Sequence, residues 1–397
     1  MKEGWEYKPA GEIFDITDYV SNGSFASLRE NVKYLDHPDY AVLIRLADYS
    51  NGFDKKNFVY VSKQSYEFLA KSKLFGGEII MSNVGSIGKS FLCPKLDCPM
   101  TIGPNAILIR SGNNRFFLYY FQSEDFNKKL LSISSRATLK KFNKTNFKTL
   151  SIPVPPLSEQ QQIVEYLDAQ FKRIDALKAN AEQQLQAAKD LFQSSIDNFF
   201  KLSQSRILKD LVDIINGYAF KSEDFKKDAE LKIIKITNVG VGEFIEDDSR
   251  INIIHKNLDI AKVYENDIVI ALTRTIISSG LKVAIIPRSY NEALLNQRVA
   301  CLRENKKSSI RYIYYYLSSN SAIKYVLSKV NTLMQPNLSI NDLKNMPVPY
   351  VNIEEQQNIV AQLDNLSAKV KQLQTNYEQT ITLCNDLKQS LLKRIFE

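Results

Sequence analysis

Apolar residues recur every three to four positions along two long stretches of the chain, residues 157–202 and 353–397. In the first stretch, one apolar track falls at positions 164, 171, 185, 192 and 199, with Lys178 interrupting it, and a second at 167, 174, 181 and 188. In the second stretch, the tracks fall at 363, 370, 377, 384 and 391, and at 359, 366, 373 and 387. Neither stretch contains proline or glycine. This pattern predicts two long helices that pair through a coiled-coil seam.

From these tracks we expect the following residues to form the seam: Leu167, Phe171, Ile174, Leu185, Leu363, Val370, Tyr377 and Leu391. Each stretch follows a proline-containing turn, and Ser158, directly before Glu-Gln-Gln, is the predicted N-cap of the first helix. The alternative is a pair of surface helices on separate domains. It accounts less well for an apolar stripe of this length that occurs twice.

The two stretches belong to an internal repeat. Residues 147–168 align with residues 343–364 at a constant offset of 196 without a gap, and both contain Glu-Gln-Gln, Ile-Val and Leu-Asp at matching positions. A period of this length is too long for a solenoid and indicates two large half-molecules.

Each helical stretch is preceded by a segment of about 150 residues that reads as mixed α/β structure with many short strands. Matching apolar runs occur at 42–49 and 232–239, at 78–85 and 267–274, and at 105–110 and 298–303, followed by aromatic helices at 116–126 and 310–320. We therefore predict a mixed α+β fold with a pseudo-two-fold internal repeat, in which two globular α/β domains are separated by two long helices in an antiparallel coiled coil. The predicted segments are 1–156, 157–202, 203–352 and 353–397.

Composition and charge narrow the function. The 397 residues are 44% hydrophobic and 24% charged, which is typical of globular proteins, and the formal net charge is +8. The two helical stretches are mildly acidic, so the basic excess lies wholly in the α/β segments. This distribution favours a polyanion bound by the globular domains and spaced by the helices, over a basic surface without a partner.

The four cysteines are too few for a disulfide framework, and the chain has neither an apolar signal core near its start nor a membrane-spanning run. We expect a cytoplasmic protein in a reducing compartment, with no membrane partner.

Catalytic and metal motifs are weak. The run 84–90, Val-Gly-Ser-Ile-Gly-Lys-Ser, resembles a phosphate loop, but Asn83 stands where that loop needs its first glycine. Cys93 and Cys98 have no further cysteine or histidine nearby to complete a metal site. Asp39, with the Asp-Lys-Lys run at 54–56, fits a permissive nuclease pattern that has no copy in the second half. We predict no catalytic residue and no metal site in this chain.

The repeated segments IPVPPLSEQQQIVEYLD (152–168) and MPVPYVNIEEQQNIVAQLD (346–364) resemble the specificity subunit of type I restriction-modification systems. The second copy departs from the first at Asn352 and Ile353, which replace Pro156 and Leu157. The resemblance implies two target-recognition domains, each reading one half of a split site in double-stranded DNA.

The resemblance also implies two copies of a methyltransferase subunit on the coiled coil, and it allows a restriction-translocase subunit in the assembly. S-adenosylmethionine, ATP and Mg²⁺ would then be bound by the partner subunits and no cofactor by this chain. A helix of ~42 residues spans roughly 60 Å, nearly two turns of B-DNA, which is enough to set a fixed gap between two half-sites.

Candidate DNA-contacting residues lie at matching places in both halves: after predicted strands, in later loops and near the end of each α/β segment. They are chosen by chemistry, because Arg favours guanine, Asn and Gln favour adenine, and Lys favours phosphate. In the first half they are Arg45, Asp48, Ser82, Asn83, Ser86, Asn105, Arg136, Thr138, Lys140 and Lys141. In the second half they are Lys235, Asn238, Thr273, Arg274, Thr275, Asn296, Gln297, Arg298, Asn331, Gln335 and Asn337.

The leading hypothesis is a non-catalytic scaffold that reads an asymmetric, bipartite DNA site, because the two α/β segments differ while the helical segments match. A self-contained restriction or modification enzyme would need a nuclease or methylase site that the sequence does not display. A coiled-coil assembly protein that binds no DNA is the third reading.

Overall fold

The structure is a computed structural model that describes residues 4–135, 139–201, 204–221, 224–225, 229–252, 261–277, 280–329 and 337–397. The chain forms two compact units. Unit 1 comprises Met1–Ala181 and Gln379–Glu397, and unit 2 comprises Glu182–Glu378. Each unit contains an α/β domain and a part of each of the two longest helices, α8 (Leu157–Phe199) and α12 (Ile353–Phe396).

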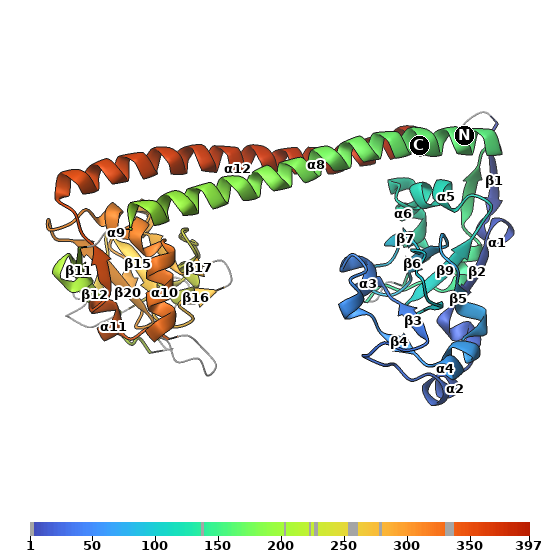
Figure 1. Ribbon diagram of the computed structural model, residues 1–397, viewed down its shortest axis with the longest axis horizontal. Helices are drawn as coiled ribbons and strands as arrows, with labels where there is room; N and C mark the ends of the chain where they lie inside the picture. The colour runs from blue at the N-terminus through green and yellow to red at the C-terminus, as the bar shows by residue number, and fades with distance from the viewer. Residues whose placement is uncertain are drawn as a thin grey trace. The chain divides into compact units, whose positions relative to one another are not determined.

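Three sheets form the strand framework of unit 1 (Figure 1). The central one has the order β2 (Asp15–Asp18), β9 (Ala106–Arg110), β6 (Ile79–Ser82), β7 (Ser90–Leu92), and all its pairs are antiparallel. The second has the order β4 (Tyr60–Val61), β3 (Ala41–Ile44), β8 (Met100–Ile102), β5 (Lys73–Leu74). A third pairs β1 (Glu6–Pro9) with β10 (Ser151–Val154). β3 and β6 are buried along their whole length, which explains their uninterrupted apolar runs.

The helices of unit 1 are α1 (Ala10–Ile13), α2 (Phe25–Asn31), α3 (Leu46–Ser50), α4 (Lys63–Phe68), α5 (Asn114–Phe121), α6 (Glu124–Ser132) and α7 (Lys144–Lys148). Helix α5 begins after Asn113, whose side chain accepts a hydrogen bond from the Phe116 backbone NH. Figure 1 shows α5 and α6 between the central sheet and α8. The rings of α5 pack on Phe171 of α8 and on Phe396 of α12, so the long helices are part of the core of this unit.

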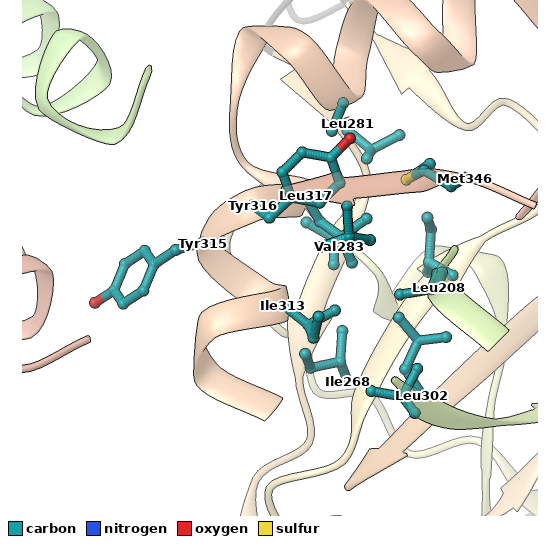
Figure 2. Packing of buried hydrophobic residues seen from close by; sticks show 14 of the residues in the cluster. Leu208, Ile268, Leu281, Val283, Leu302, Ile313, Tyr315, Tyr316, Leu317 and Met346 are labelled. Atoms are coloured by element: carbon teal, nitrogen blue, oxygen red, sulfur yellow. The ribbon is translucent and has the colours of Figure 1, made fainter. Parts of the chain in front are cut away.

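Unit 2 repeats this framework. Its central sheet has the order β12 (Val212–Asn216), β20 (Val299–Glu304), β15 (Ile268–Ala271), β18 (Val283–Ile285). A three-stranded sheet has the order β14 (Arg250–Ile251), β13 (Leu231–Ile234), β19 (Leu294–Leu295). Two strand pairs complete the unit: β11 (Ser205–Ile207) with β21 (Pro347–Pro349), and β16 (Ile276–Ile277) with β17 (Gly280–Leu281). Its helices are α9 (Ile310–Leu317), α10 (Asn320–Lys329) and α11 (Ile340–Lys344). Figure 2 shows α9 packing Ile313 and Tyr316 into the core of this unit. Two α/β domains and two long helices confirm the predicted mixed α+β fold.

A cluster that we call the aspartate clamp ties each α/β domain to a long helix. Its members are Arg115, Tyr119 and Asp168 in unit 1, and Arg311, Tyr315 and Asp364 in unit 2, at the repeat offset of 196. In unit 1, Arg115 Nε donates to both carboxylate oxygens of Asp168, at 2.7 and 2.8 Å, and the Tyr119 hydroxyl also donates to this carboxylate. In unit 2, Tyr315 points out of the apolar cluster (Figure 2), and its hydroxyl donates to Asp364 at 2.5 Å.

The long helices pair within each unit along the predicted apolar tracks. In α8 the second track is the more deeply buried of the two, and in α12 the first track is. In unit 1, Lys178 Nζ donates to Asn385 Oδ1 at 3.2 Å, and Lys388 contacts Asp175 at 2.5 Å, so the local pairing is antiparallel. Of the predicted seam residues, four are buried and four are half-buried. The buried ones are Leu167, Ile174, Leu363 and Val370, and the half-buried ones are Phe171, Leu185, Tyr377 and Leu391.

Two expectations about the helices are wrong. Leu373 and Leu387, which we expected on the second track of α12, are exposed, because that track lies one position later and contains Gln374, Ile381 and Lys388. Ser158 is not the N-cap of α8, since the helix already begins at Leu157. In the second copy the cap is Asn352, whose side chain accepts a hydrogen bond from the Glu355 NH at 2.9 Å.

Among the described helices, none has the length and hydropathy needed to span a lipid bilayer.

Candidate nucleic-acid interface

Several of the candidate residues meet at one end of each central sheet. In unit 1, β6 ends and its neighbour β9 begins at this end, where the Asn83 NH donates to the Asn105 carbonyl at 3.1 Å. A third segment closes the site, because the Phe142 NH donates to the Asn83 carbonyl at 3.1 Å and Val84 bridges to Lys141. Three loops that are distant in sequence therefore share one surface.

The same backbone hydrogen bonds recur in unit 2. The Leu272 NH donates to the Arg298 carbonyl at 2.9 Å, the Leu338 NH donates to the Leu272 carbonyl at 2.8 Å, and Thr273 bridges to Asn337. This pattern sets three equivalences between the units: Asn83 with Leu272, Asn105 with Arg298, and Lys141 with Asn337. The backbone frame is conserved between the halves, whereas the side chains that it presents differ.

The structure divides the described candidates by exposure. Those with exposed side chains are Ser86, Asn105, Lys140, Lys141, Arg274, Gln297, Arg298 and Asn337. Half-buried are Arg45, Asn83, Lys235, Thr273 and Asn296, and buried are Asp48, Ser82, Asn238 and Thr275. The remaining candidates, Arg136, Thr138, Asn331 and Gln335, lie outside the described residues.

Asp48 and Asn238 hold equivalent turns. Asp48 accepts hydrogen bonds from the backbone NH of Arg45 at 2.8 Å and from its guanidinium at 2.7 and 3.1 Å. Asn238 accepts from the Lys235 NH at 2.8 Å and donates to the Ile245 carbonyl. With these bonds made inside the domain, Asp48 and Asn238 position the loops, and Arg45 and Lys235 are their half-exposed partners.

A cavity of about 550 Å³ opens among the loops of unit 1. It is lined by Asp18, Tyr19, Val20, Phe25, Leu28, Arg29, Val32, Tyr34, Asn83, Val84, Pro104, Asn105, Ala106, Lys141 and Phe142. Three of these, Asn83, Asn105 and Lys141, are sequence-predicted candidates. The sequence did not indicate the cavity wall formed by residues 18–34, because the aromatic side chains of this segment are spaced irregularly and follow neither a strand nor a helix period.

Burial and charge shift several titratable groups around these surfaces. Burial and the neighbouring Tyr34 hydroxyl, which bonds to it at 3.2 Å, raise the pKa of Tyr19. In unit 2, burial and the nearby Arg274 guanidinium lower the pKa of Lys282. Burial raises the pKa of the Cys93 thiol to about 12, so this cysteine is protonated at neutral pH and is a poor nucleophile.

The part of the chain that the structure describes contains no cluster of three or more His, Cys, Asp or Glu side chains that could hold a metal ion. Cys93, Cys98, Cys301 and Cys384 are all free thiols.

The family model for the type I restriction modification DNA specificity domain matches residues 2–187 and 201–383. The specificity subunit of the type I restriction enzyme EcoKI from Escherichia coli K12 is 25% identical, and the alignment covers 100% of this chain and 89% of that subunit. The MjaVIII specificity subunit of Methanocaldococcus jannaschii is 28% identical over 66% of each chain.

Two solved structures share the fold over the whole chain. One comes from a study of complex assembly and conformational transition of the type I restriction-modification system, with a TM-score of 0.75, 16% identity and coverage of 100% of this chain and 98% of that one. The other is the HsdS subunit from Thermoanaerobacter tengcongensis, with a TM-score of 0.54, 17% identity and coverage of 100% and 97%.

Proposed function

Because this chain belongs to the type I restriction modification DNA specificity family, we propose that it reads an asymmetric, bipartite DNA site with one α/β domain for each half-site. Specificity subunits are the non-catalytic, DNA-recognising members of restriction-modification complexes. The chain therefore supplies sequence recognition, and the methylation and cleavage chemistry belongs to other subunits. We assign S-adenosylmethionine, ATP and Mg²⁺ to those subunits and place the complex in the cytoplasm.

The observation that carries this proposal is the contrast between a repeated frame and unlike surface side chains. The loop hydrogen bonds are the same in both units, yet Asn105 of unit 1 corresponds to Arg298 of unit 2. Asparagine pairs bidentately with adenine and arginine with guanine in the major groove. A reader of a palindrome would keep the same side chains in both halves, whereas unlike side chains favour two different half-sites.

The matched variants Asn105→Ala and Arg298→Ala test this assignment, since the two residues occupy equivalent, exposed positions. Each variant is co-expressed with the methyltransferase subunit, and the methylated sites of the host are mapped by sequencing. We expect each substitution to relax or weaken one half-site by ~1–3 kcal/mol and to leave the other unchanged. Changes in both half-sites from either variant, or a native site that is one continuous palindrome, would exclude the two-reader proposal.

We further propose residues 1–156 and 203–352 as the two readers, with the helical segments 157–202 and 353–397 as the spacer. An α-helix of 43 residues, the length of α8, spans roughly 65 Å at ~1.5 Å per residue. This length supports a fixed gap between half-sites of nearly two turns of B-DNA.

The long helices also present a pair of equivalent apolar surfaces, which we propose as docking patches for two methyltransferase subunits. Patch 1 consists of Leu177 and Leu387 in unit 1, with exposed fractions of 58% and 49%. Patch 2 consists of Leu191 and Leu373 in unit 2, with exposed fractions of 59% and 41%. The repeat offset of 196 relates Leu177 to Leu373 and Leu191 to Leu387, so each patch has the same composition. Exposed leucines that recur in this way favour a repeated protein partner over incidental exposure.

Each patch can be removed without touching the other. The double variants Leu177→Glu/Leu387→Glu and Leu191→Glu/Leu373→Glu change exposed side chains, so little loss of folding stability is expected. Native mass spectrometry of the co-purified complex should give two methyltransferase copies for the wild type, one for either double variant and none for the quadruple variant. Two bound copies in the quadruple variant would show that the patches do not dock this partner.

A further inference from the structure

The cavity in unit 1 has an apolar, aromatic lining, which binding to the DNA phosphate backbone does not require. It is mostly apolar, with aromatic walls from Tyr19, Tyr34 and Phe142 and with Phe25 at 82% exposure. Phosphate contacts require cations on an open surface, whereas an apolar recess of this size suits a flat, largely apolar group.

Asn83, one of the residues that line this cavity, has a side-chain oxygen without a partner in the described part of the chain. Among the residues that the structure describes, Asn83 Oδ1 is buried and receives no hydrogen bond, although the backbone NH and carbonyl of Asn83 are both bonded. A buried acceptor without a donor costs folding free energy, so a ligand that brings an N–H group into the cavity would gain more than one that brings only apolar surface. An aromatic recess with one unsatisfied amide oxygen therefore selects a planar heterocycle with an N–H edge.

We propose that this cavity takes up one unstacked nucleobase of the bound DNA, with Asn83 Oδ1 accepting a hydrogen bond from the exocyclic amine of that base and an aromatic side chain covering its face. The inference rests on the proposed DNA-reading function, because the cavity lies between the loops that carry Asn105 and Lys141. Proteins that take a base out of the stack hold it in this way, with stacking on the faces and hydrogen bonds on the polar edge. The exposed Phe25 ring at the cavity is suited to fill the gap that the departing base leaves in the duplex.

Unit 2 offers an internal comparison. The backbone position of Asn83 is occupied there by Leu272, which has no acceptor on its side chain. Base uptake of this kind is therefore assigned to the half-site read by unit 1 alone. Leu272 also shows that this backbone position accepts leucine, which makes Asn83→Leu a variant that should fold.

The experiment uses the full chain in complex with its methyltransferase and duplexes that contain its recognition site. Fluorescent analogues, 2-aminopurine for each purine and pyrrolocytosine for each cytosine, replace the bases of both half-sites one at a time. DNA binding is measured on the same samples by fluorescence anisotropy. Asn83→Leu removes the acceptor and Phe25→Ala removes the exposed ring, and Leu272→Ala is the matched control in unit 2.

We expect the fluorescence to rise on binding at one position of the unit 1 half-site, and the rise to be lost in Asn83→Leu and reduced in Phe25→Ala, with no change in Leu272→Ala. The affinity of Asn83→Leu should fall by about threefold to tenfold, the range of one net hydrogen bond. A mismatch at the responding position should tighten binding by the wild type, since an unpaired base costs less to extract.

Tight, sequence-specific binding without a fluorescence rise in the unit 1 half-site would overturn the base-uptake proposal and leave the DNA-reading function intact. A rise that Asn83→Leu fully retains would overturn the role of the cavity. Absence of DNA binding by the complex would instead refute the proposed function itself.

Discussion

The aspartate clamp should contribute more to stability than its surface position suggests, and Asp168→Ala tests this. The carboxylate accepts hydrogen bonds from a half-exposed arginine, Arg115, and from the hydroxyl of Tyr119, whose residue is only 6% exposed. A hydrogen bond to a charged group is worth ~1.5–3 kcal/mol, and an exposed ion pair ~0–1 kcal/mol. Since Tyr119 loses its partner on the buried side, we expect a loss of about 2–3 kcal/mol in the free energy of unfolding.

Urea unfolding of the full chain measures this change. With a slope of ~2 kcal/mol per M of urea, a loss of 2 kcal/mol moves the midpoint by about 1 M. If the two units unfold in separate transitions, Asp168→Ala should move one and Asp364→Ala the other. Tyr119→Phe should show most of the effect of Asp168→Ala, and the double variant should cost less than the sum of the two.

Asp175→Ala is the matched control, because Asp175 also pairs with a cation, Lys388 at 2.5 Å, but its side chain is 59% exposed and receives no tyrosine hydroxyl among its described hydrogen bonds. We expect its cost to stay below about 0.5 kcal/mol. Equal and small shifts for Asp168→Ala and Asp175→Ala would refute the reasoning, because the buried tyrosine would then contribute nothing.

Three further predictions follow from burial and charge. The pKa values of Tyr119 and Tyr315 are raised, first by burial. The stability that these two groups contribute is therefore complete below the ordinary tyrosine pKa of about 10 and is lost as the pH rises above it. Replacing both tyrosines with Phe should make the unfolding free energy fall less steeply at alkaline pH. Arg274→Ala should weaken or relax only the half-site read by unit 2, by ~1–3 kcal/mol if the arginine bonds a guanine, as mapped by methylation sequencing. Leu363→Asp places an unpaired charge at a fully buried position, so urea unfolding should show a loss of about 3–5 kcal/mol and the methyltransferase should co-purify less well.

The long helices could be predicted from the sequence because apolar residues at a helical spacing lie on one face of the helix, and that face is the one that becomes buried. Leu167 and Leu363, at the same place in the two copies, are fully buried, as expected. The second track of α12 was assigned wrongly because apolar character alone cannot distinguish a seam from an exposed patch. Leu373 and Leu387 are exposed, whereas Lys388 takes a seam position with its ammonium 4.8 Å from the Phe171 ring centroid.

The candidate interface was predictable where it follows a strand end and not where it depends on several loops. Asn83 and Asn105 each stand next to an apolar run, and the structure brings them together with Lys141. Phe25 and Tyr34 gave no periodic signal, and only the tertiary fold places them at the same cavity. The unsatisfied state of Asn83 Oδ1 depends on every neighbour in space, so no sequence pattern could indicate it.

The repeat separates what this fold holds constant from what it varies. Acidic residues before equivalent strands make similar contacts. Glu78 accepts two backbone NH groups and Asp267 accepts one, and each faces an arginine, Arg110 or Arg303, on the neighbouring strand. The loops at the far end of the same strands carry different side chains. Leu272 in unit 2 stands at the position of Asn83 in unit 1, although the backbone hydrogen bonds are the same. A frame that holds its loops by backbone bonds lets side chains change at little cost in folding free energy. The loop ends of the central sheets are therefore where substitutions should alter recognition without unfolding the protein.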